Sequence, residues 1–219
     1  QNEILVQCSL LHPNSRWYSG AGLFREVELW QAPSVHLVPN GLYIASREQP
    51  DGSWQVNVSA EIGRAGADAP DWQNRELMVR IAALDGSCAA ELSVPFDRWE
   101  QIPADDAWRT GCETEIFRAS CSFTLQNPKL WSLETPNLYH AQAILRSAGQ
   151  ETDSIETRFG CRTIEATPDK GLFVNHQHVQ IKGVCMHHDL GGLGSAFEYS
   201  AAKRQMEILK SMGTNSIRT

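Results

Sequence analysis

The chain has 219 residues and a formal net charge of −7, from 19 basic and 26 acidic side chains. Charged residues make up 21% and hydrophobic residues 42% of the chain, a balance that is typical of globular proteins and excludes a disordered chain. No apolar run reaches the roughly 20 residues that a membrane helix needs. The acidic pI of about 5.5 argues against a nucleic-acid surface, whereas a neutral ligand such as a sugar is compatible with it.

The six cysteines occur without a C-x-x-C pair, so neither a disulfide scaffold nor a structural zinc ribbon is predicted. We expect Cys121 to face inward from a strand as a small apolar residue. The first residues, Gln-Asn-Glu-Ile-Leu-Val, do not have the pattern of a signal peptide. Periplasmic, secreted and cytoplasmic locations all stay open.

Residues 1–32 form a segment of their own in the sequence. Residues 4–10 and the stretch containing Val27 and Leu29 are each predicted to form a strand. Between them, residues 13–25 are rich in Gly, Ser and aromatic residues. Such a stretch is typical of a loop at a binding surface, and an ordinary packed Ω-loop is an equally open interpretation.

Residues 33–165 are dominated by a period of two, in which every second residue is apolar. Turn signals such as Pro50–Ser53 and Asp85–Ser87 separate the alternating runs, and no helical pattern interrupts them. Short strands with regular turns predict an antiparallel β-sandwich. The residues expected to share the buried faces are Val56, Val58 and Ile62; Leu77, Val79 and Ile81; the odd positions from Phe117 to Leu125; and Tyr139, Ala141, Ala143 and Leu145.

From residue 166 the pattern changes. Residues 171–182 predict a β-hairpin that turns at 175–177, and residues 183–189 predict a short strand followed by a loop. From Ser200 apolar residues recur at helical spacing, with Ser200 as the expected N-cap, Lys210 in the last turn and Gly213 as the stop signal. Strand, helix and strand predict the first unit of a parallel α/β fold. Because an eight-stranded barrel needs about 250 residues, we interpret 166–219 as the start of a truncated barrel.

The predicted helix has an apolar stripe that includes Met206 and Leu209. An exposed stripe of this kind favours association with another surface. We expect it to pack on the sandwich of its own chain or to mediate self-association with a second copy.

Candidate functional residues gather at the ends of the two predicted parallel strands. His187, His188 and Asp189 follow the first strand, and Arg218 lies on the second. Ligands bind at the carboxyl ends of strands in α/β domains, so these side chains could donate hydrogen bonds to substrate hydroxyls or hold a carboxylate. Solvated loop histidines and an exposed arginine are the alternative interpretation.

Two further kinds of chemistry have candidate residues in the sequence. His176 and His178 on the hairpin, with the histidines near residue 187, have the side chains for a zinc site, but turns are usually hydrated and we predict neither a metal nor a cofactor. Glycoside hydrolysis generally needs two positioned carboxylic groups. Glu134 and Glu198 are candidates without an evident partner, and nucleophile-elbow, P-loop, dinucleotide and H-E-x-x-H motifs do not occur.

Six segments in chain order together resemble glycoside hydrolase family 2, which contains β-galactosidases, β-glucuronidases and β-mannosidases. Leu133 stands where the family usually has proline, and Cys161 where it has an aromatic residue. The segments that carry the resemblance are Pro13–Arg25, Leu130–Tyr139, Phe159–Arg162, Gly171–Val184, Cys185–Gly191 and Met212–Thr219.

The resemblance implies three domain portions. Residues 1–32 would be the end of a sugar-binding jelly roll, 33–165 an immunoglobulin-like β-sandwich, and 166–219 the start of the TIM barrel. The fold class implied is mainly β, with a C-terminal hairpin and a strand–helix–strand unit. The partner implied for the parent protein is a carbohydrate with a terminal β-glycosidic bond.

The resemblance also implies residue roles. His187 would contact substrate hydroxyls and help to stabilise the transition state, and Arg218 would lie behind the catalytic centre. His188 and Asp189 would line the same rim, while Arg16 and Trp17 would belong to a loop that approaches the barrel mouth. Family members retain anomeric configuration with two glutamates, which we expect beyond Thr219, so no catalytic residue is assigned in this chain and the isolated chain is expected to be inactive. The alternative is a non-catalytic carbohydrate-binding or spacer module.

Overall fold

The computed structural model describes residues 3–9, 22–23, 26–66, 70–103, 113–187 and 189–219. Its contacts divide the chain into two compact units. One unit contains residues 31–179, and the other contains residues 1–30 together with 180–219. We describe each unit by itself.

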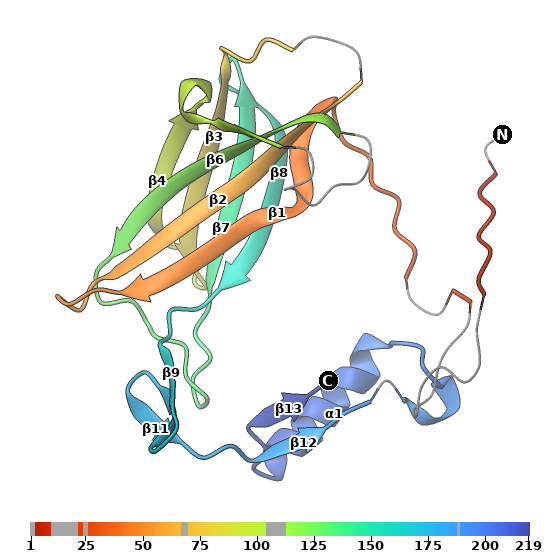
Figure 1. Ribbon diagram of the computed structural model, residues 1–219, viewed down its shortest axis with the longest axis vertical. Coiled ribbons are helices and arrows are strands. Elements are labelled where there is room, and N and C mark those ends of the chain that lie inside the picture. The colour runs from red at the N-terminus through yellow and green to blue at the C-terminus, as the bar shows by residue number, and fades with distance from the viewer. Residues whose placement is uncertain (1–2, 10–21, 24–25, 67–69, 104–112, 188) are drawn as a thin grey trace. The chain divides into compact units, whose positions relative to one another are not determined.

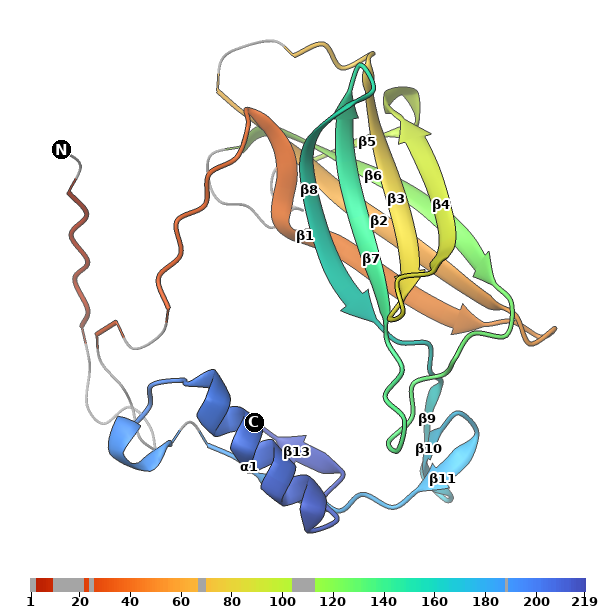
Figure 2. The ribbon, with the colours of Figure 1, turned by 180° about the vertical axis from the view of Figure 1, so that it is seen from behind.

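The larger unit is built around two antiparallel four-stranded sheets (Figures 1 and 2). The first has the strand order β1-β2-β6-β5, and the second has the order β4-β3-β7-β8. The predicted antiparallel sandwich is therefore confirmed. The strands are β1 (Val35–Glu48), β2 (Trp54–Ala65), β3 (Arg75–Ala83), β4 (Cys88–Pro95), β5 (Glu100–Ile102), β6 (Glu113–Leu125), β7 (Tyr139–Ser147) and β8 (Gln150–Phe159).

The alternating residues form the core between the two sheets. Val56, Val58 and Ile62 of β2 and Leu77, Val79 and Ile81 of β3 are all at most 2% exposed. The predicted faces of β6 and β7 contribute to the same cluster. Polar residues occupy most of the other positions, with Met78 and Ile144 as buried apolar exceptions, so the period of two largely selects which side of each sheet faces the core.

Different interactions close the two open sides of the sandwich. On one side, Asp153 of β8 accepts a hydrogen bond of 2.7 Å from the backbone N–H of Leu37 in β1. This bond falls where β1 bulges away from β2, between Leu37 and Leu42, so a carboxylate satisfies an amide that the ladder leaves open. Elsewhere four aromatic rings pack in stacked, tilted and edge-to-face pairs: Trp72, Phe96, Trp99 and Phe117.

A small three-stranded sheet follows the sandwich, in the order β11-β10-β9. Its strands β10 and β11 form the predicted hairpin, and the turn residues Asn175 and His176 have φ of 49° and 63°. The Asn175 carboxamide accepts from Thr163 N at 3.1 Å and donates to Trp131 O at 2.9 Å. The bounds are β9 (Ile164–Thr167), β10 (Gly171–Val174) and β11 (Gln177–Val179).

The contacts around Asn175 connect three of the segments on which the family resemblance depends. The guanidinium of Arg162 lies 4.3 Å from the centre of the Trp131 ring, a cation–π distance. A Cβ at Gly160 would lie 2.9 Å from the Trp131 Cβ, so only glycine lets the chain pass there. With Asn175 these contacts form what we call the hairpin anchor: Trp131, Gly160, Arg162 and Asn175.

The smaller unit contains a parallel pair of strands with a helix beside it (Figures 1 and 2). The helix begins at Tyr199 rather than after Ser200. Its N-cap is Glu198, whose carboxylate accepts from Ala201 N at 3.0 Å, so the predicted Ser200 cap is wrong: Glu198 reaches the free amide of the first turn and Ser200 donates to Glu198 instead. The elements are β12 (Gly183–Cys185), η3 (Gly191–Leu193), α1 (Tyr199–Ser211) and β13 (Ser216–Arg218).

The helix otherwise ends as predicted. Lys210 lies in the last turn and Gly213 has φ of 87°. Gly213 N donates to Lys210 O and Thr214 N donates to Leu209 O. These two hydrogen bonds are the pattern of a Schellman C-cap. Met206 and Met212 are 37% and 72% exposed; self-association through this stripe stays a prediction.

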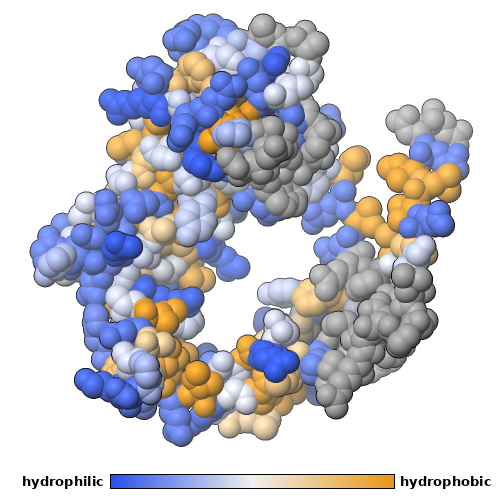
Figure 3. Space-filling model, in the orientation of Figure 1, coloured by the Kyte–Doolittle hydropathy of each residue, from blue (hydrophilic) through white to orange (hydrophobic). Residues whose placement is uncertain are grey.

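The two strands predicted in residues 1–32 do not form among the described residues. Residues 3–9 and 26–33 have no strand assignment. Their apolar side chains are open to solvent, with Leu5 90% and Leu29 92% exposed (Figure 3). Alternation alone does not make a strand, because the backbone groups need a neighbouring strand with which to pair.

The compact units and the predicted domain portions have different limits. The larger unit extends to residue 179 and includes the hairpin, which the hairpin anchor attaches to the sandwich. The assignment of 1–32, 33–165 and 166–219 to three domains of a larger enzyme stays a prediction. The helices among the described residues fall short of the length and apolarity needed to cross a bilayer.

The hairpin anchor predicts a stability effect for Asn175. Asn175→Ala removes two hydrogen bonds to backbone groups and places alanine at positive φ, so we expect the free energy of unfolding to fall by about 2–3 kcal/mol. Asn175→Asp keeps the acceptor for Thr163 N and should lose about half as much. Urea unfolding measures both.

Asn57→Ala is the matched control for this prediction. Asn57 is exposed on β2 and accepts one hydrogen bond from Ser122, so its replacement should cost less than about 1 kcal/mol. Equal losses at positions 57 and 175 would contradict the anchoring role.

The burial of two cysteines predicts their reactivity. Burial raises the pKa of the Cys161 thiol and of the Cys121 thiol to about 11, so both stay protonated at pH 8, and the thiolate is the reactive form. Iodoacetamide at pH 8 should therefore modify the exposed Cys88 and Cys185 first, as read by peptide mass spectrometry. Labelling of Cys161 at the rate of Cys185 in the folded protein would refute this.

Candidate functional site at the ends of the parallel strands

The candidate site is built on the parallel pairing of β12 and β13. Val184 lies opposite Ile217 and Cys185 opposite Arg218, and the strands run in the same direction. Beyond the last pair, Met186 N donates to Arg218 O at 2.8 Å. Both strands therefore end at one edge, which is where α/β domains bind ligands.

His187 and Arg218 meet at this edge. His187 follows Met186 directly, and Met186 is hydrogen-bonded to the backbone of Arg218. The His187 residue is half-buried and Arg218 is exposed. The backbone thus places an imidazole and a guanidinium at neighbouring strand ends, as the sequence predicts for strands adjacent in the sheet.

Asp189 shapes the loop that leaves this edge. Its carboxylate accepts from Gly191 N at 3.0 Å, and its own backbone N–H donates to His187 O at 2.8 Å. The loop continues into η3, where Gly191 and Gly194 have φ of 60° and 59°, values that favour glycine. Asp189 therefore supports the turn after His187.

Three predicted site residues lie outside the described residues. These are His188 in the same loop and Arg16 and Trp17 in the N-terminal segment. Their predicted roles stay predictions.

The hairpin histidines belong to the other unit. His176 Nε2 lies 2.7 Å from Glu48 Oε2 of β1, and the His178 ring packs edge to face on Phe173 at 5.5 Å. No group of three or more His, Cys, Asp or Glu side chains that could hold a metal ion occurs in the part of the chain that the structure describes. His176 instead forms an ion pair with β1 when it is protonated.

The carboxylate of Glu198 serves the helix. Hydrogen bonds from Ala201 N, Ser200 N and the Ser200 hydroxyl hold the pKa of Glu198 below its usual range. A general acid in glycoside hydrolysis needs a raised pKa, so this environment suits an N-cap rather than an acid.

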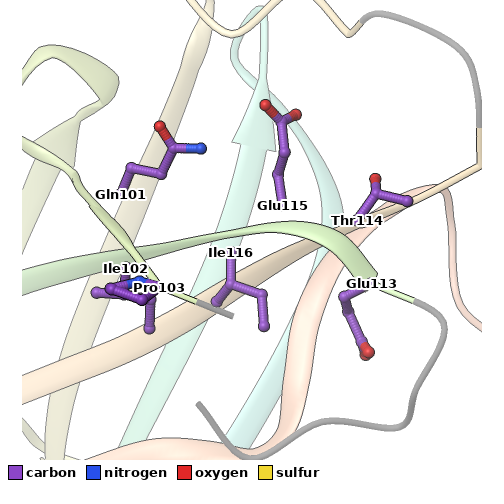
Figure 4. A pocket seen from close by; sticks show the side chains of 7 residues that line it. All are labelled: Gln101, Ile102, Pro103, Glu113, Thr114, Glu115 and Ile116. Carbon is purple, nitrogen blue, oxygen red and sulfur yellow. The ribbon is translucent and has the colours of Figure 1, made fainter. Parts of the chain in front are cut away.

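A cavity of about 370 Å³ lies at one end of the sandwich, beside β5 and β6 (Figure 4). The Ile102, Ile116 and Glu113 side chains point to the same side of it (Figure 4). A bulge in β6 opposite Arg64 and Ala65 turns Glu113 inward, where His36 Nε2 lies 3.3 Å from its carboxylate. The lining residues are Gln101, Ile102, Pro103, Glu113, Thr114, Glu115 and Ile116.

This buried pair was not found by sequence reasoning, because His36 and Glu113 are 77 residues apart. The sequence feature that corresponds to this pair is the glycine at position 63. A Cβ there would lie 2.7 Å from the Glu113 Cγ, so the packed carboxylate requires glycine. Glu115 also pairs with Arg64 at 2.7 Å. Each carboxylate thus links strands of the sandwich, which gives the cluster a packing function.

A second cavity of about 440 Å³ lies on the small sheet. Phe173 stands between Glu165 and His178 in the strand register. In such a cavity the aromatic ring can pack against the face of a sugar, and the neighbouring charged and hydroxyl side chains can hydrogen-bond to the sugar hydroxyls. The lining residues are Glu165, Thr167, Asp169, Lys170, Phe173 and His176.

Comparison with known proteins identifies the proteins to which this chain is similar. Residues 92–162 match the sequence pattern of Glycosyl hydrolases family 2. A β-galactosidase of Bacteroides ovatus is 30% identical over 94% of this chain and 22% of its own length. A β-glucuronidase of Bacteroides fragilis is 34% identical over 43% of this chain and 14% of its own length.

Solved structures agree with this result. A β-glycosidase from Bacteroides vulgatus superposes with a TM-score of 0.72 at 27% identity, over 93% of this chain and 23% of that protein. The chain therefore spans about a fifth of the relatives that it matches along most of its length. The sequence segments, the sandwich and these matches show that the chain is similar to a part of glycosyl hydrolase family 2 members.

Proposed function

We propose that the parent protein hydrolyses terminal β-glycosidic bonds with retention of configuration, as a β-galactosidase-like enzyme. The observation that carries the proposal is that the parallel strands β12 and β13 end at one edge, where the backbone of Arg218 is hydrogen-bonded to Met186, the residue before His187. The similarity to a named β-galactosidase over 94% of the chain supports the substrate class.

The proposed roles follow from the chemistry of these two side chains. The His187 imidazole would hydrogen-bond to a substrate hydroxyl, a contact that is worth most when it strengthens in the transition state. The Arg218 guanidinium would orient a catalytic carboxylate by paired N–H···O bonds. Asp189 would hold the loop that carries both histidines.

The bond-breaking groups would come from elsewhere in the parent. Retention requires a nucleophilic carboxylate and an acid/base carboxyl about 5–5.5 Å apart. In this chain Glu113, Glu115 and Glu198 are committed to strand packing or helix capping. We propose that the two catalytic glutamates follow Thr219 and that the 219 residues alone do not hydrolyse glycosides.

An assay of the parent protein on chromogenic β-glycosides tests this function. The wild-type parent should release aglycone from a β-galactoside, and the 219-residue chain should not. His187→Ala and Arg218→Ala should each lower kcat/KM about 100-fold or more. The control Asn57→Ala, on β2 of the sandwich, should leave kcat/KM within twofold of the wild-type value. A parent inactive on galactosides, glucuronides and mannosides, or an active 219-residue chain, would overturn the proposal.

A non-catalytic sugar-binding function is the second candidate, and the cavity around Phe173 is the observation that favours it. It predicts that the 219-residue chain binds galactosides, with heat measurable by titration calorimetry. Phe173→Ala should then weaken binding at least tenfold, and Tyr43→Ala, an exposed ring on β1, should not. Absence of binding at millimolar galactoside would rule this candidate out.

A further inference from the structure

Asn215, in the segment between α1 and β13, is hydrogen-bonded to the backbone that precedes β12. Asn215 N donates to Lys182 O at 3.0 Å, and Lys182 N donates to Asn215 Oδ1 at 2.8 Å. The second side-chain atom, Asn215 Nδ2, donates to Gln180 O at 2.9 Å. One residue thus makes three bonds to the backbone just before β12.

These bonds extend a strand pair that is short by itself. β12 and β13 have three residues each, and parallel pairing is slightly weaker per residue than antiparallel pairing. A slip by one residue would turn the side chains of β13 to the other face. A slip by two would move Arg218 by about 6–7 Å along the strand.

The C-cap of α1 delivers Asn215 to this place. Gly213 at positive φ and the paired bonds to Lys210 O and Leu209 O reverse the chain in a fixed geometry. Asn215 follows two residues later, at the amino ends of the strands. The carboxamide therefore lies at the opposite end of β13 from Arg218, and it acts on backbone groups.

We propose that Asn215 is a positioning residue that fixes the register of β13 on β12 and so holds Arg218 beside His187. The inference rests on the proposed function and deepens it. Asn215 supplies an acceptor and a donor from one planar group, which matches the N–H of Lys182 and the C=O of Gln180. Asn215 is not a catalytic residue, because its polar atoms bond to main chain away from the ligand edge.

The kinetic test uses the parent protein and the variants Asn215→Ala and Asn215→Asp. Loss of register misplaces Arg218, and a misplacement of about 1 Å can cost on the order of 100-fold. We expect Asn215→Ala to lower kcat 10- to 100-fold with KM within threefold. Asn215→Asp keeps the acceptor and should fall between it and wild type. The Asn57→Ala variant serves as the control.

A double-mutant comparison separates positioning from general destabilisation. If Asn215 acts through Arg218, Asn215→Ala should lower kcat by less than twofold in an Arg218→Ala background. An equal fold-loss in both backgrounds would overturn the inference. So would an active wild-type parent whose kcat is unchanged by Asn215→Ala.

Hydrogen exchange gives a readout that does not need activity. The Met186 amide is bonded to Arg218 O, so Asn215→Ala should speed its exchange at least tenfold in the parent, with β2 amides unchanged. Unchanged exchange at Met186 would overturn the inference even if the parent cleaved no glycoside. A parent with no glycosidase activity but with faster Met186 exchange in the variant would refute the proposed function alone.

Discussion

The parallel pairing of β12 with β13 is the constraint on which the functional account depends. It is the only parallel pairing among the described strands, and it sends two strand ends to one edge. With antiparallel strands, His187 and Arg218 would lie at opposite ends of the strand pair. The helix between the strands follows from the same requirement, because parallel neighbours need a crossover connection.

The sandwich is the part of the larger unit that contains the main hydrophobic core. Its core residues are almost fully buried, and the buried Glu113 carboxylate lies 3.3 Å from His36 Nε2. The hairpin anchor attaches the small sheet to the sandwich through Asn175 and Trp131.

Much of the fold could be predicted because burial in a sandwich has a local signature. Alternation identifies β2, β3, β6 and β7, since each has one face in the core. The helix was recognised by its apolar spacing and by Gly213. The sequence does not predict its first residue correctly, because a glutamate can also act as an N-cap. Here the Glu198 carboxylate accepts a hydrogen bond from the backbone amide of Ala201, three residues later.

Features that depend on distant partners could not be predicted. The alternation of Ile4, Val6, Val27 and Leu29 does not produce strands among the described residues, because pairing is a property of two segments. The His36–Glu113 pair and the hairpin anchor join positions separated by 77 and 44 residues. The placement of His187 by Arg218 was predicted only because strand, helix and strand occur in order.

Covalent trapping tests the central claim most directly. A 2-deoxy-2-fluoro-β-galactoside with a good leaving group accumulates the glycosyl-enzyme intermediate of a retaining enzyme, and peptide mapping then identifies the nucleophile. The account predicts that the parent protein is labelled on a glutamate that follows Thr219. A sugar found attached to any carboxylate within residues 1–219 would contradict it.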